Sequence, residues 1–159
     1  MGHTETTVVL LKPDALQRSL VGQIIHRFER KGLKLIGLKM LSVHDALIEE
    51  HYGHHKDKPF FKDLKEFMQS SPIIAMAWQG LDAVATVRSL CGPTKGRVAP
   101  AGTIRGDFSM GIQANVVHAS DSLETAKKEL KRFFEDNELF SYGKCDFKYV
   151  YYGEEKSGR

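Results

Sequence analysis

The chain of 159 residues is 42% apolar and 27% charged, and it carries a net charge of +3 at pH 7. That length suits one domain whose core is large enough to fold without disulfides or metal. The charge is too small to require nucleic acid as a partner, and no apolar run is long enough to cross a bilayer. The two cysteines form no CxxC pair, which favours a reducing, cytoplasmic setting. We expect one domain over residues 1–159, with flexible tails at 1–5 and 153–159, and no membrane partner.

Apolar runs predict the strands of the fold. Three of them have the composition of buried strands, namely Thr6–Leu11, Leu33–Leu41 and Ile73–Gln79. The alternation of the second run slips at Gly37, which indicates a bulge. A fourth strand is expected around Asn115–Val117, and the chain ends in a strand-like segment at Tyr149–Tyr152.

Helical spacing and capping residues predict the intervening helices. They are Val21–Lys31 closed by Gly32, a short helix from the cap Asp45 to Tyr52, one opened by Pro59 and ending near Ser70, Asp82–Leu90, and Asp121–Phe134 with Leu123, Ala126, Leu130 and Phe133 buried. The order of elements predicts an α/β (α+β) fold, a ferredoxin-like β-α-β-β-α-β sandwich. In this fold a four-stranded antiparallel sheet is covered by helices.

One segment, Gly92–Gln113, has neither helical nor strand periodicity. Loops of this length without structure of their own are uncommon and are usually functional or disordered. The segment is rich in hydrogen-bond donors, including Thr94 and Arg105, and Arg88 lies on the helix before it. We interpret it as a loop that clasps a polyphosphate. A solvated surface loop is the alternative, and we prefer that alternative for Lys95 and Arg97 taken singly.

The most informative stretch is the octet Asn115–Ser122. The pair Val116 and Val117 predicts a short buried strand that ends on His118, and the Ser120-Asp121-Ser122 run supplies helix-capping side chains. A neutral imidazole is a competent nucleophile near neutral pH if a partner on its other nitrogen fixes the tautomer. The octet therefore indicates a nucleophilic histidine at a strand-to-helix junction.

This octet resembles the active-site signature of nucleoside diphosphate kinases. Further blocks follow in the same order over nearly the whole chain, and they are Thr7–Asp14, His51-Tyr52, Lys58–Phe61, Met76–Trp78 and Gly102–Phe108. The resemblance implies a ping-pong transfer in which a nucleoside triphosphate phosphorylates His118 and a nucleoside diphosphate collects the phosphoryl group. It also implies Mg²⁺ held mainly by the nucleotide phosphates, with no side chain assigned as a metal ligand. The chain has no glycine-rich P-loop.

The resemblance assigns roles to individual residues. His118 would react through Nδ1, while Glu129, with Ser120 beside it, would accept the other ring N–H. Three residues, Lys12, Tyr52 and Asn115, would touch the sugar hydroxyl and the transferred phosphoryl group. The phosphates would be contacted by Arg88, Thr94 and Arg105. The base would be enclosed by Phe60, Leu64 and Ile112.

Each of these residues also has an ordinary structural alternative. Phe60 and Leu64 are at helical spacing and would suit a core, Tyr52 would suit a helix end, and Lys12 would suit a solvated strand end. Glu129 would suit an i,i+4 helix pair. Their joint match to one template favours the catalytic roles.

Two positions depart from the family pattern. His54 stands where relatives often carry an acid; a metal site with His51 and His55 is possible, although solvated histidines are the simpler interpretation. Gly96 stands where many relatives carry proline. The resemblance implies a homohexamer whose long loops meet. We therefore expect an assembly that dissociates more easily than proline-bearing relatives, and one that Gly96→Pro stabilises if the local φ permits.

Two rival functions compete with this interpretation. A catalytically silent scaffold would be expected to lose His118 or a phosphate-binding arginine, and none is lost. A nucleic-acid-binding domain would show aromatic and basic residues on its central strands, whereas these strands are built of Val, Leu, Ile and Ala. We therefore expect partners that are nucleoside tri- and diphosphates and further copies of the chain.

Overall fold

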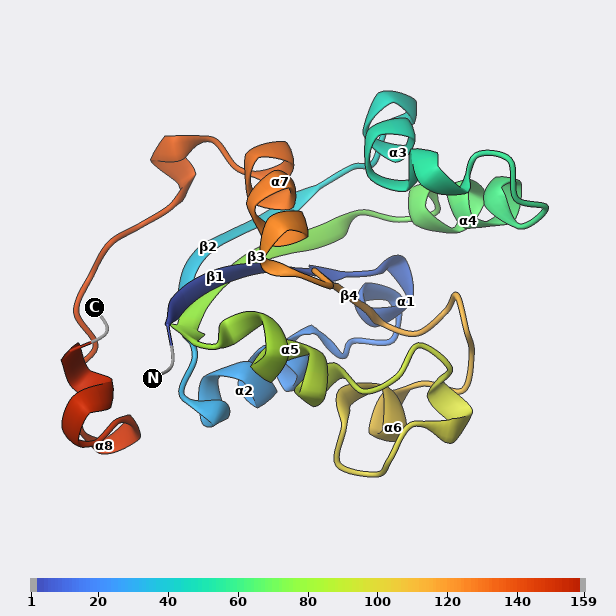
Figure 1. Ribbon diagram of the computed structural model, residues 1–159. Coiled ribbons are helices and arrows are strands. Elements are labelled where there is room, and N and C mark those ends of the chain that lie inside the picture. The colour runs from blue at the N-terminus through green and yellow to red at the C-terminus, as the bar shows by residue number, and fades with distance from the viewer. Residues whose placement is uncertain (1–2, 158–159) are drawn as a thin grey trace.

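The structure is a computed structural model that describes residues 3–157. Its centre is a four-stranded antiparallel sheet in the order β2-β3-β1-β4. The strands are β1 (Thr4–Leu11), β2 (Lys34–Leu41), β3 (Ile73–Leu81) and β4 (Val117–Ala119). The register between β2 and β3 shifts between Leu35 and Gly37, which confirms the predicted bulge. The antiparallel sheet covered by helices is the predicted fold class (Figure 1).

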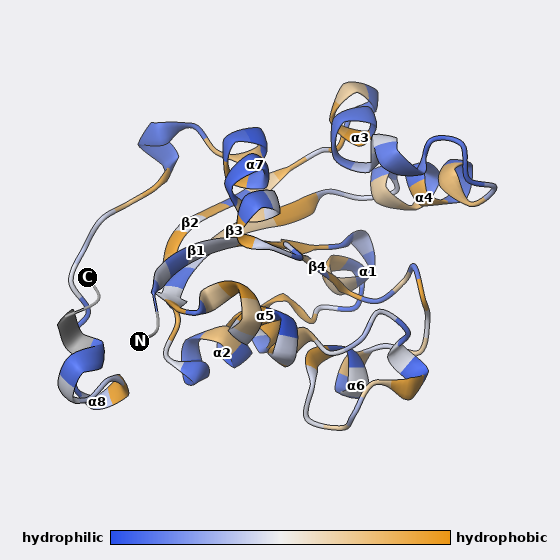
Figure 2. Ribbon diagram, in the orientation of Figure 1, coloured by the Kyte–Doolittle hydropathy of each residue, from blue (hydrophilic) through white to orange (hydrophobic). Residues whose placement is uncertain are grey.

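Helices cover both faces of the sheet, because residues of the two central strands alternate between two cores. Val9 and Leu11 pack with the helices on one face, and Val8 and Leu10 pack with those on the other. The first face carries α1 (Pro13–Gln17), α2 (Val21–Lys31), α5 (Ala83–Cys91) and α6 (Ile104–Phe108), and the second carries α3 (Asp45–Tyr52), α4 (Phe61–Gln69) and α7 (Leu123–Phe133). In Figure 2 much of β2 and β3 carries the apolar colour, whereas α7 is mostly hydrophilic.

The long helices lie where periodicity predicts them, with differences at their ends. α2 matches its predicted bounds, and Gly32 ends it with φ +98°. The cap of α3 is His44, whose ring nitrogen accepts from the Leu47 N–H, and not Asp45. α4 begins at Phe61, two residues after Pro59. Leu123 is 40% exposed, so its predicted burial is wrong; as the first residue of α7 it precedes the stripe that faces the sheet.

The fourth strand is shifted from its predicted position. It runs from Val117 to Ala119, so His118 lies in the strand, opposite Leu10 of β1, and does not end it. The shift arises at Val116, which has φ +62°, a left-handed conformation that no strand residue adopts. The chain turns there before it can pair with β1.

One further expectation is wrong, and the structure adds detail to two others. Tyr149–Tyr152 is not a strand, because α8 (Phe147–Val150) occupies most of it. The loop Gly92–Gln113 contains the 3-10 turn Gly96–Val98 and helix α6, which Thr103 caps by accepting from the Gly106 N–H. Of the predicted tails, residues 4–5 belong to β1 and Gly153–Ser157 forms a 3-10 helix, while residues 1, 2, 158 and 159 lie outside the described part.

Besides Gly96–Val98 (η2) and Gly153–Ser157 (η4), the described residues form 3-10 segments at Gly53–His55 (η1) and at Asp136–Glu138 (η3). Within residues 3–157, no helix has the length and apolar character needed to cross a membrane.

Candidate active site

A cavity of about 1250 Å³ opens beside β4, between the two helical layers. Its walls come from the ends of β1 and β4, from α3, α5 and α7, and from the long loop. Ten of the expected nucleotide-contacting and catalytic side chains line it together with the proposed nucleophile: Lys12, Tyr52, Phe60, Leu64, Arg88, Thr94, Arg105, Ile112, Asn115 and Glu129, with His118. Ser120 is fully buried behind the wall.

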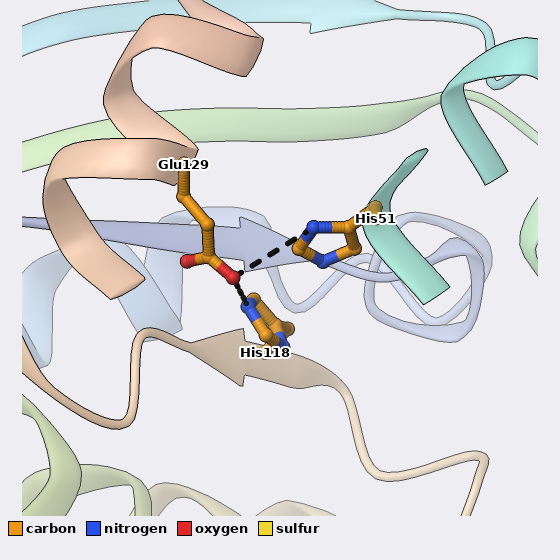
Figure 3. A group of neighbouring side chains, drawn as sticks. All are labelled: His51, His118 and Glu129. Carbon is orange, nitrogen blue, oxygen red and sulfur yellow. Dashed lines mark hydrogen bonds and ion pairs between the residues drawn. The ribbon is translucent and has the colours of Figure 1, made fainter. Parts of the chain in front are cut away.

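His118 is oriented by a buried carboxylate (Figure 3). Its Nε2 lies 2.8 Å from Glu129 Oε1, and the Ser120 hydroxyl donates to Glu129 Oε2 at 2.6 Å. Glu129 is only 2% exposed, so it is not the surface helix residue of the alternative interpretation. Because a carboxylate accepts, the imidazole proton sits on Nε2, which leaves the lone pair of Nδ1 for a nucleophilic role.

The backbone that leads into β4 is fixed by the end of β1. Val116, in its left-handed conformation, receives the Lys12 N–H on its carbonyl oxygen at 2.9 Å, and its own N–H donates to Asp14 Oδ2 at 3.1 Å. A β-branched residue at positive φ is strained by about 1–3 kcal/mol, and such strain persists only where surrounding contacts hold it. Asp14, which the sequence interpretation did not assign to the site, is therefore a residue that positions His118.

Lys12 lies inside the site and is not a solvated strand end. Its ammonium donates to Asn115 Oδ1 at 2.7 Å and to the Gln113 carbonyl at 3.1 Å, and it is 7% exposed. Burial, and next the positive charge of Arg105, lower the pKa of Lys12 to about 8. Asn115 in turn donates to the Thr94 carbonyl at 2.9 Å, which ties the octet to the long loop.

Arg105 projects from α6 into the wall of the cavity. It donates to the carbonyls of Gly92 and Val117, each at 2.7 Å, and its Nε is buried with no partner among the described residues. Burial lowers the pKa of Arg105. The guanidinium thereby links the start of the long loop, at Gly92, to Val117 of β4, next to His118.

The loop that carries Arg105 is anchored to α2. Arg27 donates to the Gly102 carbonyl at 3.0 Å and pairs with Asp107, whose other oxygen accepts from the Gly102 N–H at 2.8 Å. These hydrogen bonds and the ion pair hold α6 in place against α2. Lys95 and Arg97 are exposed, which agrees with the solvated alternative preferred for these two residues.

The opposite end of the cavity is apolar and open. Phe60 and Ile112 are exposed there, as a stacking surface for a base requires, whereas Leu64 is largely buried in the core beneath them. The ring of His55 lies 5.3 Å from that of Phe60 and 3.9 Å from that of His54.

Tyr52 is the residue whose placement differs most from expectation. Its ring lines the cavity, 6.3 Å from the His118 ring, but its hydroxyl faces the sulfur of Met68 at 4.0 Å in the core. Burial raises the pKa of this hydroxyl. The structure therefore brings the ring of Tyr52, and not its hydroxyl, to the nucleophile.

Metal-ligand side chains come together, among the described residues, in His51, His118 and Glu129, whose candidate atoms lie within 4.8 Å of one another. Mg²⁺ prefers oxygen ligands in an octahedron, whereas this group offers two nitrogens and one carboxylate whose oxygens already accept hydrogen bonds. These residues do not fit a protein-made Mg²⁺ site. His54 and His55 do not join the group, so the three-histidine site considered for this run does not form.

Comparison with known proteins shows the family to which the chain belongs. A sequence model of the nucleoside diphosphate kinase family matches residues 5–139. The chain is 55% identical to a nucleoside diphosphate kinase of Parabacteroides distasonis (87% of this chain and 90% of that protein) and 54% identical to one of Staphylothermus marinus (88% and 99%). The structure of a halophilic nucleoside diphosphate kinase from Halobacterium salinarum in complex with CDP superposes with a TM-score of 0.91 at 42% identity, covering 94% of this chain and 100% of that one.

The fold and these likenesses define a phosphotransferase of nucleotide metabolism. The chain belongs to the nucleoside diphosphate kinase family, and its activity is that of a nucleoside-diphosphate kinase.

Proposed function

We propose that His118 carries the phosphoryl group between a nucleoside triphosphate and a nucleoside diphosphate. The observation that carries this proposal is the bond from His118 Nε2 to the buried Glu129, because it leaves Nδ1 unprotonated in a cavity lined by cations. In the first half-reaction Nδ1 attacks the γ-phosphorus, a P–N bond forms, and the bond from phosphorus to the β-phosphate oxygen breaks. The nucleoside diphosphate leaves with that electron pair.

The second half-reaction reverses the first on another nucleotide. A β-phosphate oxygen of the acceptor attacks phosphorus, and the P–N bond breaks back to Nδ1. The ring keeps its Nε2 proton throughout, so it is cationic while it is phosphorylated, and the Glu129 carboxylate stabilises that charge. We assign Lys12, Arg88 and Arg105 to neutralising the phosphates, since phosphoryl transfer depends on positioning and charge more than on covalent chemistry.

The remaining assignments follow from position in the cavity. We assign Thr94 and Asn115 to orienting the phosphates and sugar, and Phe60, Leu64 and Ile112 to enclosing the base. Tyr52 would contact the nucleophile through its ring. Mg²⁺ would arrive on the nucleotide phosphates and supply charge neutralisation there, and no described side chain is needed to hold it.

We also infer a homohexamer in the cytoplasm. Apolar side chains are exposed on the edge strand β2, at Leu38 and Met40, and on the long loop, at Val98 and Met110. Further copies of the chain would cover this surface, as burial of apolar area stabilises association. A nucleic-acid-binding sheet is disfavoured, because helices cover both of its faces.

Incubation with γ-labelled ATP tests the proposal. The protein should take up an acid-labile, base-stable label and lose it to an added nucleoside diphosphate, while His118→Asn should take up none. His54→Asn is the matched control, because His54 is an exposed histidine at the mouth of the same cavity. Labelling of His118→Asn, or failure of the label to leave for a diphosphate, would contradict the proposal.

A further inference from the structure

A second imidazole, that of His51 on α3, is packed against the first. The His51 ring is 6% exposed and meets the His118 ring edge-on, with centroids 4.6 Å apart. The rings of Tyr52 and Phe133 hold it on two other sides, at 4.4 and 5.1 Å. His51 therefore has one fixed orientation directly beside the proposed nucleophile.

Arg132 fixes the tautomer of this second imidazole. Its Nη1 lies 3.0 Å from His51 Nδ1, and its Nε donates to Glu50 at 2.9 Å. A guanidinium has only donors, so His51 Nδ1 accepts and the proton of the neutral ring lies on Nε2. That Nε2 is buried and has no partner among the described residues.

The same His51 nitrogen also faces the carboxylate that orients His118. His51 Nδ1 is 3.7 Å from Glu129 Oε1, the oxygen that accepts from His118 Nε2 at 2.8 Å (Figure 3). A proton on His51 Nδ1 would point at this oxygen, and the two imidazoles would then compete for one acceptor. With Arg132 donating to Nδ1, no such proton is present.

We propose that Arg132 is a positioning residue for the phosphoryl transfer, because its hydrogen bond to His51 reserves Glu129 Oε1 for His118. The proposal rests on the proposed function of His118 and adds a role for two residues that the sequence interpretation left unassigned. Arg132 touches neither nucleotide nor phosphorus in this scheme, and it acts through His51 and Glu129.

The charges around His51 agree with this role. Arg132 and Glu129 face it from α7, His118 from β4, Lys12 from the end of β1, His54 from η1, and Glu50 and Tyr52 belong to its own helix. Burial first, then His118, Arg132, His54 and Lys12, lower the pKa of His51 to about 2.

Loss of Arg132 should raise the pKa of His51. A lowered pKa means that His51 is neutral at any pH above it. Without Arg132, one of the positive charges that oppose protonation of the His51 ring is gone. The Glu129 carboxylate remains beside Nδ1 and favours the protonated ring, so the pKa of His51 rises. Below that raised pKa, His51 competes for Glu129 and the phosphorylation of His118 slows.

The test compares Arg132→Met with Lys128→Met. Lys128 lies on the same helix, lines the same cavity and pairs with Glu124 at 2.7 Å, so its removal subtracts the same charge without touching His51. Two readouts are needed, namely the titration of the His51 ring by NMR and the single-turnover rate of labelling by γ-labelled ATP between about pH 5 and 8.

In wild type and in Lys128→Met, His51 should stay neutral over this range. In Arg132→Met the pKa of His51 should be higher, so that its ring begins to take up protons toward the acidic end of this range, although burial still lowers that pKa. Labelling at the acidic end should then fall by about tenfold more than in Lys128→Met, which is the lower end of the cost of losing the partner that orients a metal-bound histidine. Adding His51→Asn to Arg132→Met should remove the extra acidic loss, because Asn does not titrate.

Persistence of the acidic loss in the double variant would overturn the proposal, since it would then come from His118 alone. An unchanged His51 titration in Arg132→Met would overturn it as well. The NMR readout separates this proposal from the proposed function: if wild type takes up no label, the role of His118 fails, while the control of His51 by Arg132 is still measured.

Discussion

At the scale of single residues, the two oxygens of Glu129 have separate partners, His118 Nε2 at 2.8 Å and the Ser120 hydroxyl at 2.6 Å. Glu129→Gln keeps one accepting oxygen but removes the charge that stabilises a phosphorylated ring. We expect phosphorylation of His118 to slow by about 10–100-fold, by analogy with the cost of removing the partner that orients a metal-bound histidine. Stopped-flow or quench labelling measures this. Ser120→Ala is the control that leaves the charge in place and should lose less; equal rates in Glu129→Gln and wild type would return Glu129 to a structural role.

The buried ammonium of Lys12 predicts an alkaline limit to activity. Its pKa is lowered to about 8, so it carries its charge below that pH and loses it above. If Lys12 binds phosphate, kcat/KM should fall as pH rises through about 8, because this ratio reports groups of the free enzyme. Lys12→Arg, whose guanidinium stays protonated, should lower activity but remove this alkaline fall. The same fall in both proteins would assign it to another group.

Much of the site was predictable at this scale. Lys12, Asn115 and His118 occur in short motifs, and Glu129 follows at a fixed distance along one helix. His51 is in such a motif too, but its tautomer depends on Arg132, which is 81 residues away in sequence. Contacts of that kind arise when α3 and α7 pack together, and no local pattern predicts them. The direction of the Tyr52 hydroxyl, which faces the sulfur of Met68 on α4, likewise depends on the packing of two elements.

At the scale of elements, the long loop owes its shape to Gly96. The Gly96 N–H donates to the Gly111 carbonyl at 2.9 Å, and a Cβ on this residue would lie 2.4 Å from the Ser109 carbonyl oxygen. Gly96→Pro was expected to stabilise the assembly if the local φ permits. Proline would lose this hydrogen bond and bring the same Cβ, so the packing of the folded loop opposes that substitution whatever the φ.

We now predict that Gly96→Ala lowers the free energy of unfolding by about 1–3 kcal/mol, the usual range for overpacking, and that Gly96→Pro lowers it further. Gly143→Ala is the matched control, because that glycine has open space around it and no positive φ; it should be neutral or slightly stabilising. Urea unfolding of the three variants measures the difference. Equal stability of Gly96→Pro and wild type would show that the loop can rearrange.

Helices and strands are predictable from sequence where the residues that determine them are neighbours along the chain. Long helices and buried strands have periodic sequences, so they were predicted to within a few residues. β4 was displaced because one residue, Val116, turns the backbone at φ +62°. Helices α6 and α8 have five and four residues, too few for a periodic signal, and the aromatic residues near α8 resemble those of a strand.

At the scale of the whole molecule, the exposed apolar side chains of β2 and of the long loop form the surface that we propose for self-association. We predict a particle of six times the 17.9 kDa mass of one chain. Size exclusion with light scattering over a dilution series measures this. A charged substitution on the edge strand, Met40→Glu, should shift the distribution to smaller species, because it buries an unpaired charge in any interface there. A wild-type monomer that persists at high concentration would contradict the hexamer.

We propose that Glu129 fixes His118 so that Nδ1 receives the phosphoryl group. The most direct measurement is NMR of the phosphorylated protein with ¹⁵N-labelled histidine, in which the coupling between ³¹P and ¹⁵N identifies the phosphorylated ring nitrogen. We predict phosphate on Nδ1 of His118, with the Nε2 proton still present. Phosphate on Nε2, on another histidine or on a serine would contradict this account.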